Sequence, residues 1–486
     1  MVALGVAIGP RPAPAQLPSL GDGDLTIGAE RRLGEKIARD LYRDPDYLDD
    51  PVLDDYVLDV WTRLLDAARK RGELTAEMDD RFAWQVLLGK DRVINAFALP
   101  GGWLGLQLGL LNVTVTRDEL ASVLAHELSH VTQRHVSRMM SQESRNAPLL
   151  LLGMLLGALA ATKNPEAGNA LIVGGQALAA QTGLNFSRDM EREADRVGFG
   201  VATQAGFDPR GFIGMFEKLQ QASRLSDNGN FPYLRTHPMD TERIADMQAR
   251  IQLDPARPAV TEPDMLHAMM VGRSRVLSIP GVDILRSYLA EAEAGTFPAL
   301  PRARQAGVLY AAALASAKLR DLSAAARYWA KMAPLTSGDP GAARQSALLA
   351  SELAMLQGDG ARALAVLDTA SRKRPELIYS VQAQIAIGRD REAADRLQPW
   401  VTLHPRDAQA WQLLSAAYNA QHDTLRAIRA DAEAQVAHMD LQAAMDRFRA
   451  AQDIARRGGA DHIEASIIDS RARQVASLLR EQALER

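Results

Sequence analysis

The segment SVLAHELSHVTQRH, residues 122–135, restricts the possible folds of this chain more than any other feature. It holds three of the nine histidines in 486 residues, among apolar residues at the three- and four-residue spacing of a helix. His126 and His130 are four residues apart, so a helix brings both imidazoles onto one face, with Glu127 beside them. The sequence therefore predicts a helix with one metal-binding face.

Two imidazoles and an adjacent carboxylate suit a hydrolytic zinc centre. Zinc takes neutral imidazole nitrogens as ligands and lowers the pKa of a bound water toward 7. Glu127 is placed to take a proton from that water and later to protonate the leaving amine. We predict one Zn²⁺ per chain, with His126 and His130 as ligands. His135 follows His130 by five residues, so we expect it to pack or to support the site, and not to bind metal.

A catalytic zinc needs a third protein ligand, and the segment SRDMEREADRVGF is the only other one with suitable chemistry. On a helix, Glu191 shares a stripe with Ala194, Gly198 and Ala202, whose small side chains predict close packing against another helix. A carboxylate on a tightly packed face must be paired or bound to metal. We therefore predict Glu191 as the third ligand of a gluzincin-type site.

The neighbouring acidic residues receive different predictions. Asp195, one turn after Glu191, is placed to accept a ring N–H from a ligating histidine. Glu193 projects away from that stripe and is expected to be a solvated charge. The alternative for Glu191 is a structural ion pair with Arg188 or Arg192.

Composition excludes several classes of protein. The formal net charge of −4 argues against nucleic acid as a partner. The absence of cysteine excludes disulfides, thiolate ligands and cysteine nucleophiles. No apolar run reaches the roughly 20 residues of a spanning helix. The segment 1–24 has an apolar start and the small-x-small pattern Ala13-Pro14-Ala15, so it is either a remnant signal peptide or a flexible leader.

The rest of the chain is predicted to be mainly helical, with a small sheet before the histidine helix. Short strands are expected at 82–88, 96–99 and 103–106, in an antiparallel arrangement. A capping box, Thr116 with Glu119, begins the histidine helix. The predicted fold class is mainly α (α+β). The predicted domains are a leader (1–24), a metalloprotease domain (25–262), a helical linker (263–300) and a helical repeat domain (301–486).

The repeat prediction depends on turns that recur through the last third of the chain. Turns ending at Asp321, Asp359, Asp390 and Asp423 lie about 34 residues apart on average, the period of tetratricopeptide repeats. The segment from Trp411 to Tyr418 resembles the signature of that repeat, with Ser415 where glycine is usual. The alternatives are an α-solenoid of tetratricopeptide-like repeats, which we favour, and a plain helical bundle.

Several motifs together resemble one family. The chain is similar to the zinc metallopeptidases grouped with the CAAX prenyl proteases and HtpX, in HELSH-x4-H, SRDMEREADRVGF, NAFALPGG (95–102), AGFDPRGF (205–212) and LRTHPMDTERI (234–244). The lack of an apolar spanning run and the helical repeats resemble the soluble periplasmic branch of that family. The resemblance covers residues 25–250 most strongly.

The resemblance implies roles for residues outside the zinc helices. His237 would reach the open position of the zinc as a fourth, latch ligand; the alternative is a loop histidine that caps the next helix. Asn95, Ala96 and Phe97 would line a cleft where an extended substrate pairs with the strand; the alternative is an ordinary core strand.

Two apolar segments between the zinc ligands, 147–162 and 170–183, read as a helical hairpin. The hairpin would serve as core, as a lid over the cleft, or as a surface for peripheral membrane contact or an assembly partner. We favour a lid.

The sequence thus predicts a zinc endopeptidase that acts on unfolded or misassembled proteins. By resemblance, its setting is the periplasm, its clients are outer-membrane proteins and their assembly machinery, and the repeat domain binds clients or partners. The alternative from a different class is a chaperone or scaffold whose zinc site is structural or latched. An intact Glu127 argues against that alternative, because a structural site needs no base.

Overall fold

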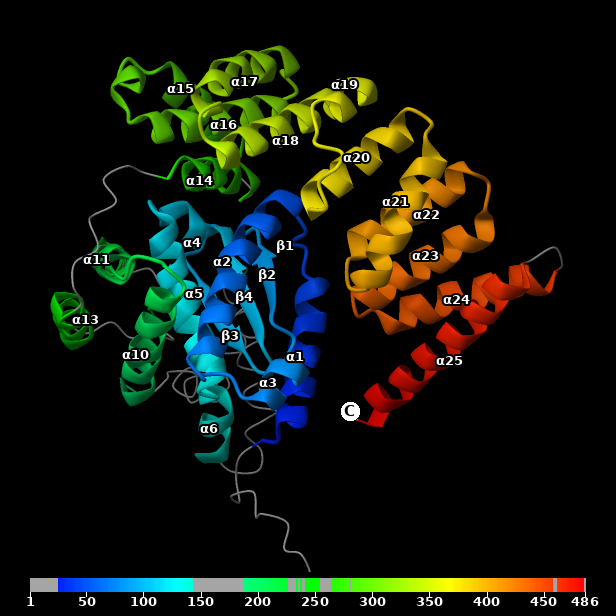
Figure 1. Ribbon diagram of the computed structural model, residues 1–486, viewed down its shortest axis with the longest axis horizontal. Helices are drawn as coiled ribbons and strands as arrows, with labels where there is room; N and C mark the ends of the chain where they lie inside the picture. The colour runs from blue at the N-terminus through cyan, green and yellow to red at the C-terminus, as the bar shows by residue number, and fades with distance from the viewer. Residues whose placement is uncertain are drawn as a thin grey trace, which may run out of the picture.

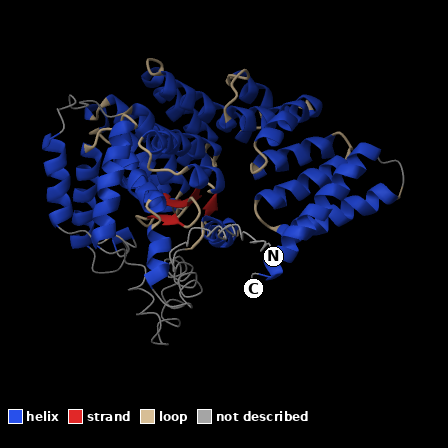
Figure 2. Ribbon diagram, turned by 60° about the horizontal axis from the view of Figure 1, so that its bottom comes forward, coloured by secondary structure: helices blue, strands red, loops and turns tan. Residues whose placement is uncertain are grey.

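The computed structural model describes residues 25–142, 188–225, 233–234, 237, 241–253, 264–278, 281–457 and 461–484. These residues form many helices and one small sheet (Figures 1 and 2), which confirms the predicted mainly α fold. The leader (1–24) and both apolar segments predicted as a hairpin lie outside the described residues. Among the described helices, none has the length and apolar character needed to cross a membrane.

The sheet has four strands in the order β1-β2-β4-β3: Tyr47–Leu48 (β1), Gln85–Gly89 (β2), Ala96–Leu99 (β3) and Trp103–Gln107 (β4). The antiparallel prediction is wrong for the central pair, because β2 and β4 run parallel while the outer pairs are antiparallel. The β3–β4 hairpin turns at Gly101 and Gly102, whose φ values of 73° and 82° favour glycine. β3 is therefore an edge strand.

Helices cover both faces of this sheet. On one face, Ile37 of α1 (Ile27–Tyr42) packs with Leu87 and Trp103. On the other face, the core is shared with α2 (Pro51–Lys70) and α5 (Arg117–Thr132). The remaining helices of this half are α3 (Ala76–Arg81), α4 (Leu108–Val113), α6 (His135–Gln142), α10 (Arg188–Gln204), α11 (Arg210–Leu225) and α13 (Thr241–Leu253). The predicted histidine segment is thus a buried helix between the sheet and α10.

The second half is a curved array of helices (Figure 1). Its helices are α14 (Met265–Leu277), α15 (Val282–Glu293), α16 (Arg302–Lys318), α17 (Leu322–Thr336), α18 (Pro340–Leu356), α19 (Gly360–Ala365), α20 (Arg374–Ala386), α21 (Asp390–Leu403), α22 (Ala408–Ala420), α23 (Thr424–Ala437), α24 (Leu441–Arg456) and α25 (His462–Leu484). A 3₁₀ turn, Phe297–Ala299, lies between α15 and α16. α14 and α15 lie in the segment predicted as a helical linker, 263–300, and the helices from α16 onward lie in the segment predicted to hold helical repeats.

The turns between paired helices share one local design. A residue with left-handed backbone, such as Arg320 or His422, is followed by an aspartate whose side chain caps the next helix. The predicted turns at Asp321, Asp359 and Asp423 have this form, and Asp390 begins α21 directly. The recurring turn explains why the repeat was visible in the sequence.

Ion pairs hold the array to the N-terminal end of α2. Three arginines, one each from α14, α18 and α20, reach four aspartates at that end: Arg273, Arg344 and Arg374 pair with Asp49, Asp50, Asp54 and Asp55. The far end of the array returns to the first half, where the His438 ring lies 5.9 Å from the Tyr42 ring of α1. The array therefore spans from α2 to α1.

Arg273 is the most buried of these arginines. Its guanidinium makes two hydrogen bonds to Asp50, of 2.8 and 2.6 Å, and donates to Glu352 and to the hydroxyls of Tyr310 and Tyr379. Asp50 also accepts from the backbone N–H of Leu53 and so caps α2. One buried cation of α14 therefore joins the start of α2 to three further helices of the array, α16, α18 and α20.

We predict that Arg273→Met lowers the free energy of unfolding by about 3–5 kcal/mol, because Asp50 would remain buried without its cation. Chemical denaturation followed by circular dichroism measures this. Arg275→Met is the matched control, since Arg275 is partly exposed, pairs with the partly exposed Glu291 and lies over the Tyr288 ring, so its loss leaves no buried carboxylate unpaired. Equal effects of the two substitutions would contradict the prediction.

A second buried contact predicts a pH effect. His267 of α14 lies 2.6 Å from the Tyr56 hydroxyl and 3.2 Å from Thr114 Oγ1, and burial lowers its pKa to about 4. The unfolded chain binds this proton first as pH falls, so this contribution to stability is complete above pH 6.5 and declines toward pH 4. We expect the melting temperature of His267→Gln to fall less than that of the wild type as the pH is lowered over this range. Calorimetry that gives equal slopes for the two proteins would refute the prediction.

Candidate metal centre

Close packing of α5 and α10 builds the site. Thr116 caps α5 by accepting from the N–H of Glu119, as the capping box predicts. Gly198 of α10 faces α5 so closely that an added Cβ would lie 3.1 Å from backbone atoms of Ala125 and His126. The predicted stripe of small residues is therefore the packing face. It brings Glu191, one turn before Ala194, beside the two histidines.

Four donor groups meet at this contact. Nitrogen atoms of His126, His130 and His237 and a carboxylate oxygen of Glu191 all lie within 4.8 Å of one another. His126 Nε2 is 3.0 Å from His130 Nε2 and 3.3 Å from His237 Nδ1. Glu191 Oε1 is 2.9 Å from His237 Nδ1 and 3.4 Å from His130 Nε2. All four side chains are buried.

These separations fit a tetrahedral zinc ion. Ligands at 2.0–2.1 Å from zinc lie roughly 3.3 Å from one another, close to the observed spacing of the donor atoms. One carboxylate oxygen at the cluster, Glu127 Oε1, is buried and accepts no hydrogen bond of good geometry from the described residues. Buried carboxylate oxygens need a partner, and a divalent cation supplies one. The donor set therefore fits the predicted metal.

Asp195 and Arg243 hold the ligands from behind. Asp195 Oδ1 lies 2.9 Å from His126 Nδ1, the contact expected from the sequence. Arg243 donates to both oxygens of Asp195 at 2.7 and 2.8 Å, and its Nη1 lies 2.7 Å from Glu191 Oε2. Arg192, the partner considered in the alternative reading, pairs with Glu242 instead. Sequence reasoning missed Arg243, since only the fold brings α13 to α10.

The electrostatics differ among the carboxylates. Burial acts to raise the pKa of Glu191, but His237, His126 and His130 hold it well below the ordinary value. Burial raises the pKa of Glu127, which suits a group that takes up a proton at neutral pH. Glu191 is thus fixed as an anion, whereas Glu127 can exchange a proton.

Glu127 is held between the edge strand and His237. Its Oε2 accepts from the Ala98 N–H of β3 at 2.9 Å, and its Oε1 lies 3.4 Å from His237 Nε2. The His237 ring stacks on Tyr233 with centroids 4.6 Å apart. One ring of His237 therefore touches both the donor cluster and the predicted base. The contacts of Ala98 and Tyr233 could not be predicted from the sequence, because only the fold brings these residues to the cluster.

The structure corrects the prediction for Glu193. Its carboxylate is not a solvated charge, because it accepts from Arg138 at 2.7 Å and lies 3.1 Å from His135 Nε2. His135 in turn lies 2.8 Å from His130, between Nδ1 atoms, and is outside the donor cluster as expected. Helix geometry alone predicts that Glu193 points away from the ligand face, but it cannot show that α6 lies on that side.

The three residues predicted to contact substrate lie at or next to the edge strand. Asn95 precedes β3 and its carbonyl accepts from Gln107, while Ala96 is fully buried. Since alternate residues of an antiparallel strand point their backbone groups the same way, Ala96 presents its N–H and C=O toward the side where Ala98 meets Glu127. The Phe97 side chain points to the opposite face and packs on Gly105.

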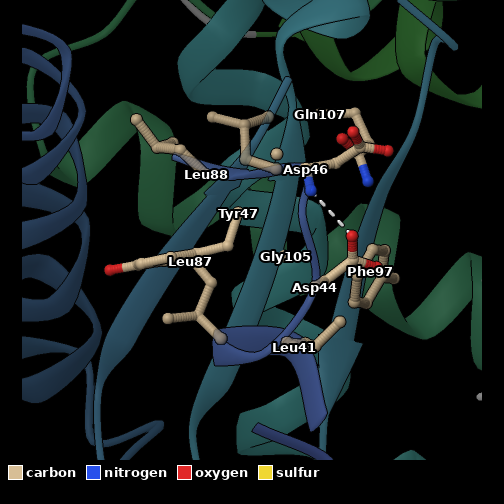
Figure 3. A pocket seen from close by; sticks show the side chains of 11 residues that line it. Leu41, Asp44, Asp46, Tyr47, Leu87, Leu88, Phe97, Gly105 and Gln107 are labelled. Atoms are coloured by element: carbon tan, nitrogen blue, oxygen red, sulfur yellow. Dashed lines mark hydrogen bonds between the residues drawn. The ribbon is translucent and has the colours of Figure 1, made fainter. Parts of the chain in front are cut away.

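A hollow at that opposite face does not belong to the metal centre. It is lined by Phe97, Gly105 and residues near the end of α1 such as Asp44 and Tyr47 (Figure 3). It has about 30 Å³ of room for the centres of water molecules, enough for a water or two and too little for a peptide. The backbone of Phe97 pairs with Gly105 of β4, so an added strand would pair with the residues beside Phe97 on β3.

Comparison with known proteins agrees with this geometry. The family model of peptidase family M48 matches residues 60–251. The chain is 30% identical over 423 residues to the beta-barrel assembly-enhancing protease of Escherichia coli (strain K12), covering 86% of this chain and 83% of that protein. It is 30% identical over 194 residues to the mitochondrial metalloendopeptidase OMA1 of Saccharomyces cerevisiae, covering 39% and 53%.

A third relative, the putative beta-barrel assembly-enhancing protease of Vibrio cholerae, is 35% identical over 245 residues, covering 50% of this chain and 49% of that protein. The fold, the four donor groups and these relatives define a metalloprotease. The chain belongs to peptidase family M48.

We predict that Glu191→Gln no longer holds a stoichiometric metal ion, because an amide is a weaker ligand than a carboxylate. Zinc per chain, measured by elemental analysis after dialysis against a weak chelator, checks this. Asp189→Asn on the same helix is the matched control, since its side chain is 92% exposed. Full zinc retention by Glu191→Gln would remove Glu191 from the ligand set.

Proposed function

We propose that this protein is a zinc endopeptidase, with His126, His130 and Glu191 as the zinc ligands. The observation that carries the proposal is the placement of Glu127 beside the donor cluster, where its Oε1 lies 3.4 Å from His237 Nε2 and accepts no hydrogen bond of good geometry from the described residues. A structural zinc site would not need a buried carboxylate at that position.

The residues of the chain have distinct tasks in peptide hydrolysis. Bound zinc would polarise the scissile carbonyl and make water acidic enough to ionise near pH 7. Glu127 takes the proton of the attacking water and later gives a proton to the leaving amine. Asp195, itself held by Arg243, accepts a hydrogen bond from Nδ1–H of His126, which keeps the proton on Nδ1 and leaves Nε2 free for the metal.

His237 would keep the enzyme idle. Its Nδ1 lies where a fourth ligand would, and its Nε2 faces Glu127, so it competes with both the water and the base. We propose that His237 is a latch and that activity requires its withdrawal.

The substrate would be an extended segment of an unfolded or misassembled protein. β3 is an edge strand of the described sheet and its outer edge lies next to Glu127, so a peptide paired with Ala96 would pass the base with sequence-tolerant main-chain hydrogen bonds. The helical array (301–486), linked through 263–300 to the protease domain (25–262), would bind clients or partners.

The setting of this activity is proposed from the relatives. Their name, beta-barrel assembly-enhancing protease, supports action on outer-membrane proteins or their assembly machinery and a periplasmic location. The residues at 1–24 would then be the remnant of a signal peptide. A chaperone or scaffold with a permanently latched zinc site is the second candidate, and the engagement of His237 with the cluster favours it.

We expect an unfolded protein such as casein to distinguish these functions, using wild type, Glu127→Gln and His237→Ala at equal zinc loading. Glu127→Gln should lose at least about 100-fold in cleavage rate, since it removes general-base catalysis. His237→Ala should cleave faster than wild type if the latch holds. His462→Ala, in an exposed part of the array, controls for loss of a histidine.

Cleavage that survives Glu127→Gln would refute the assigned base. If none of the variants cleaves while all bind zinc and keep wild-type circular dichroism, the chaperone or scaffold function replaces the protease. If His237→Ala cleaves no faster than wild type, the latch is removed from the proposal and the protease remains.

A further inference from the structure

The helix that carries the metal ligands ends in an unusual break. α5 stops at Thr132, Arg134 adopts a left-handed φ of 53°, and α6 begins at His135. Left-handed backbone costs free energy in residues other than glycine, so it persists only where surrounding contacts require it. Here Arg134 is held by Glu30 at 3.0 Å and by the Ser137 hydroxyl at 3.2 Å.

The break changes where His135 points. On an uninterrupted helix, a residue five positions after His130 would be rotated by about 140° from it and could not touch its ring. With the break, the two rings have centroids 4.8 Å apart, and their Nδ1 atoms are 2.8 Å apart. His135 is fully buried. The strained turn therefore returns a second imidazole to the back of a metal ligand.

The hydrogen bonds allow one consistent placement of protons. His130 turns Nε2 into the donor cluster, so a metal there requires the His130 proton on Nδ1. His135 Nδ1 must then accept this proton's hydrogen bond, which places the His135 proton on Nε2. That nitrogen lies 3.1 Å from Glu193 Oε2, which is able to accept. Each N–H donor in this series of hydrogen bonds, from His130 through His135 to Glu193, faces an acceptor.

Glu193 anchors the far end of the chain of hydrogen bonds. Arg138 Nη1 donates to the same Oε2 at 2.7 Å, so the carboxylate is fixed by a residue of α6. Glu193 lies on α10 between Glu191 and Asp195. This helix therefore supplies a ligand to the cluster and a carboxylate behind each histidine, one in direct contact with His126 and one relayed through His135.

We propose that His135 and Glu193 are positioning residues for His130, holding its ring so that the Nε2 lone pair points into the metal cluster. The inference rests on the zinc centre proposed above. It assigns a purpose to the break at Arg134, because the break brings His135 against His130.

The test uses the full chain and measures zinc affinity by competition with a chelating dye. Leucine and asparagine have nearly the same shape, but only asparagine can accept a hydrogen bond from His130 Nδ1–H. We expect His135→Leu to weaken zinc binding by about 10–100-fold, and His135→Asn to recover much of that loss. Glu193→Ala, at a partly exposed position that tolerates substitution, should show a smaller loss, with Asp189→Ala as the control on the same helix.

Cobalt bound in place of zinc gives a second readout, because its visible absorption bands report the geometry of its ligands. His135→Leu should change this spectrum and His135→Asn should restore it. Affinities of folded His135→Leu and Glu193→Ala within twofold of wild type would overturn the inference. So would equal losses in His135→Leu and His135→Asn with unchanged cobalt spectra, which would show a packing role.

These outcomes are separable from those of the proposed function. A wild-type chain that binds zinc with the expected ranking of variants but cleaves no casein would refute the endopeptidase and support the positioning pair. A wild-type chain that cleaves casein, with variants that bind zinc as tightly as the wild type, would support the endopeptidase and refute the positioning pair. A wild-type chain that binds no zinc would overturn both.

Discussion

The close approach of α5 and α10 is the contact on which the metal centre depends. A Cβ at Gly198 would lie 3.1 Å from the backbone at Ala125 and His126, so a side chain there would require the two helices to shift by a few tenths of an ångström. A shift of a few tenths of an ångström along this face would move Glu191 relative to His130, and a metal site tolerates little such error. The two helices come from segments about sixty residues apart. One glycine therefore decides whether the histidines and the glutamate can share an ion.

This packing brings charged side chains into the protein interior, where an unpaired charge is unfavourable. Glu127, Glu191 and Asp195 bring three carboxylates into the interior, and Arg243 supplies one positive charge. A divalent cation would bring the sum of these formal charges to zero. Without the ion, burial acts to lower the pKa of His126, but Asp195 and Glu191 raise it to about 10. A proton on His126 would then balance part of the negative charge. Because burial of unbalanced charge is unfavourable, metal binding and stability of this region are coupled.

The sequence predicted the parts of this site that follow from helix geometry alone. The spacing of His126 and His130, the cap at Thr116 and the small-residue stripe that singles out Glu191 are properties of single helices, and periodicity exposes them. Arg243 and the Ala98 N–H could not be found in this way, because only tertiary folding brings them to the cluster. Glu193 was misjudged for the same reason. The parallel pairing of β2 and β4 also depends on a chain crossing that strand patterns do not encode.

The helical array is tied to the metal centre through α2, and the two ends of the array are held differently. Near its start, Arg273 is buried against Asp50 at the head of α2, and α2 also packs on α5. Displacing this end would leave buried charges unpaired, which is costly. At the far end, the ion pair is the exposed one of Arg43 with Asp440 at 3.5 Å, a contact of small energetic value, and the rest of the contact is the packing of His438 and Met439 against α1 and β1. Motion of the array should therefore begin at its C-terminal end and leave the α2 junction, and with it the metal helices, in place.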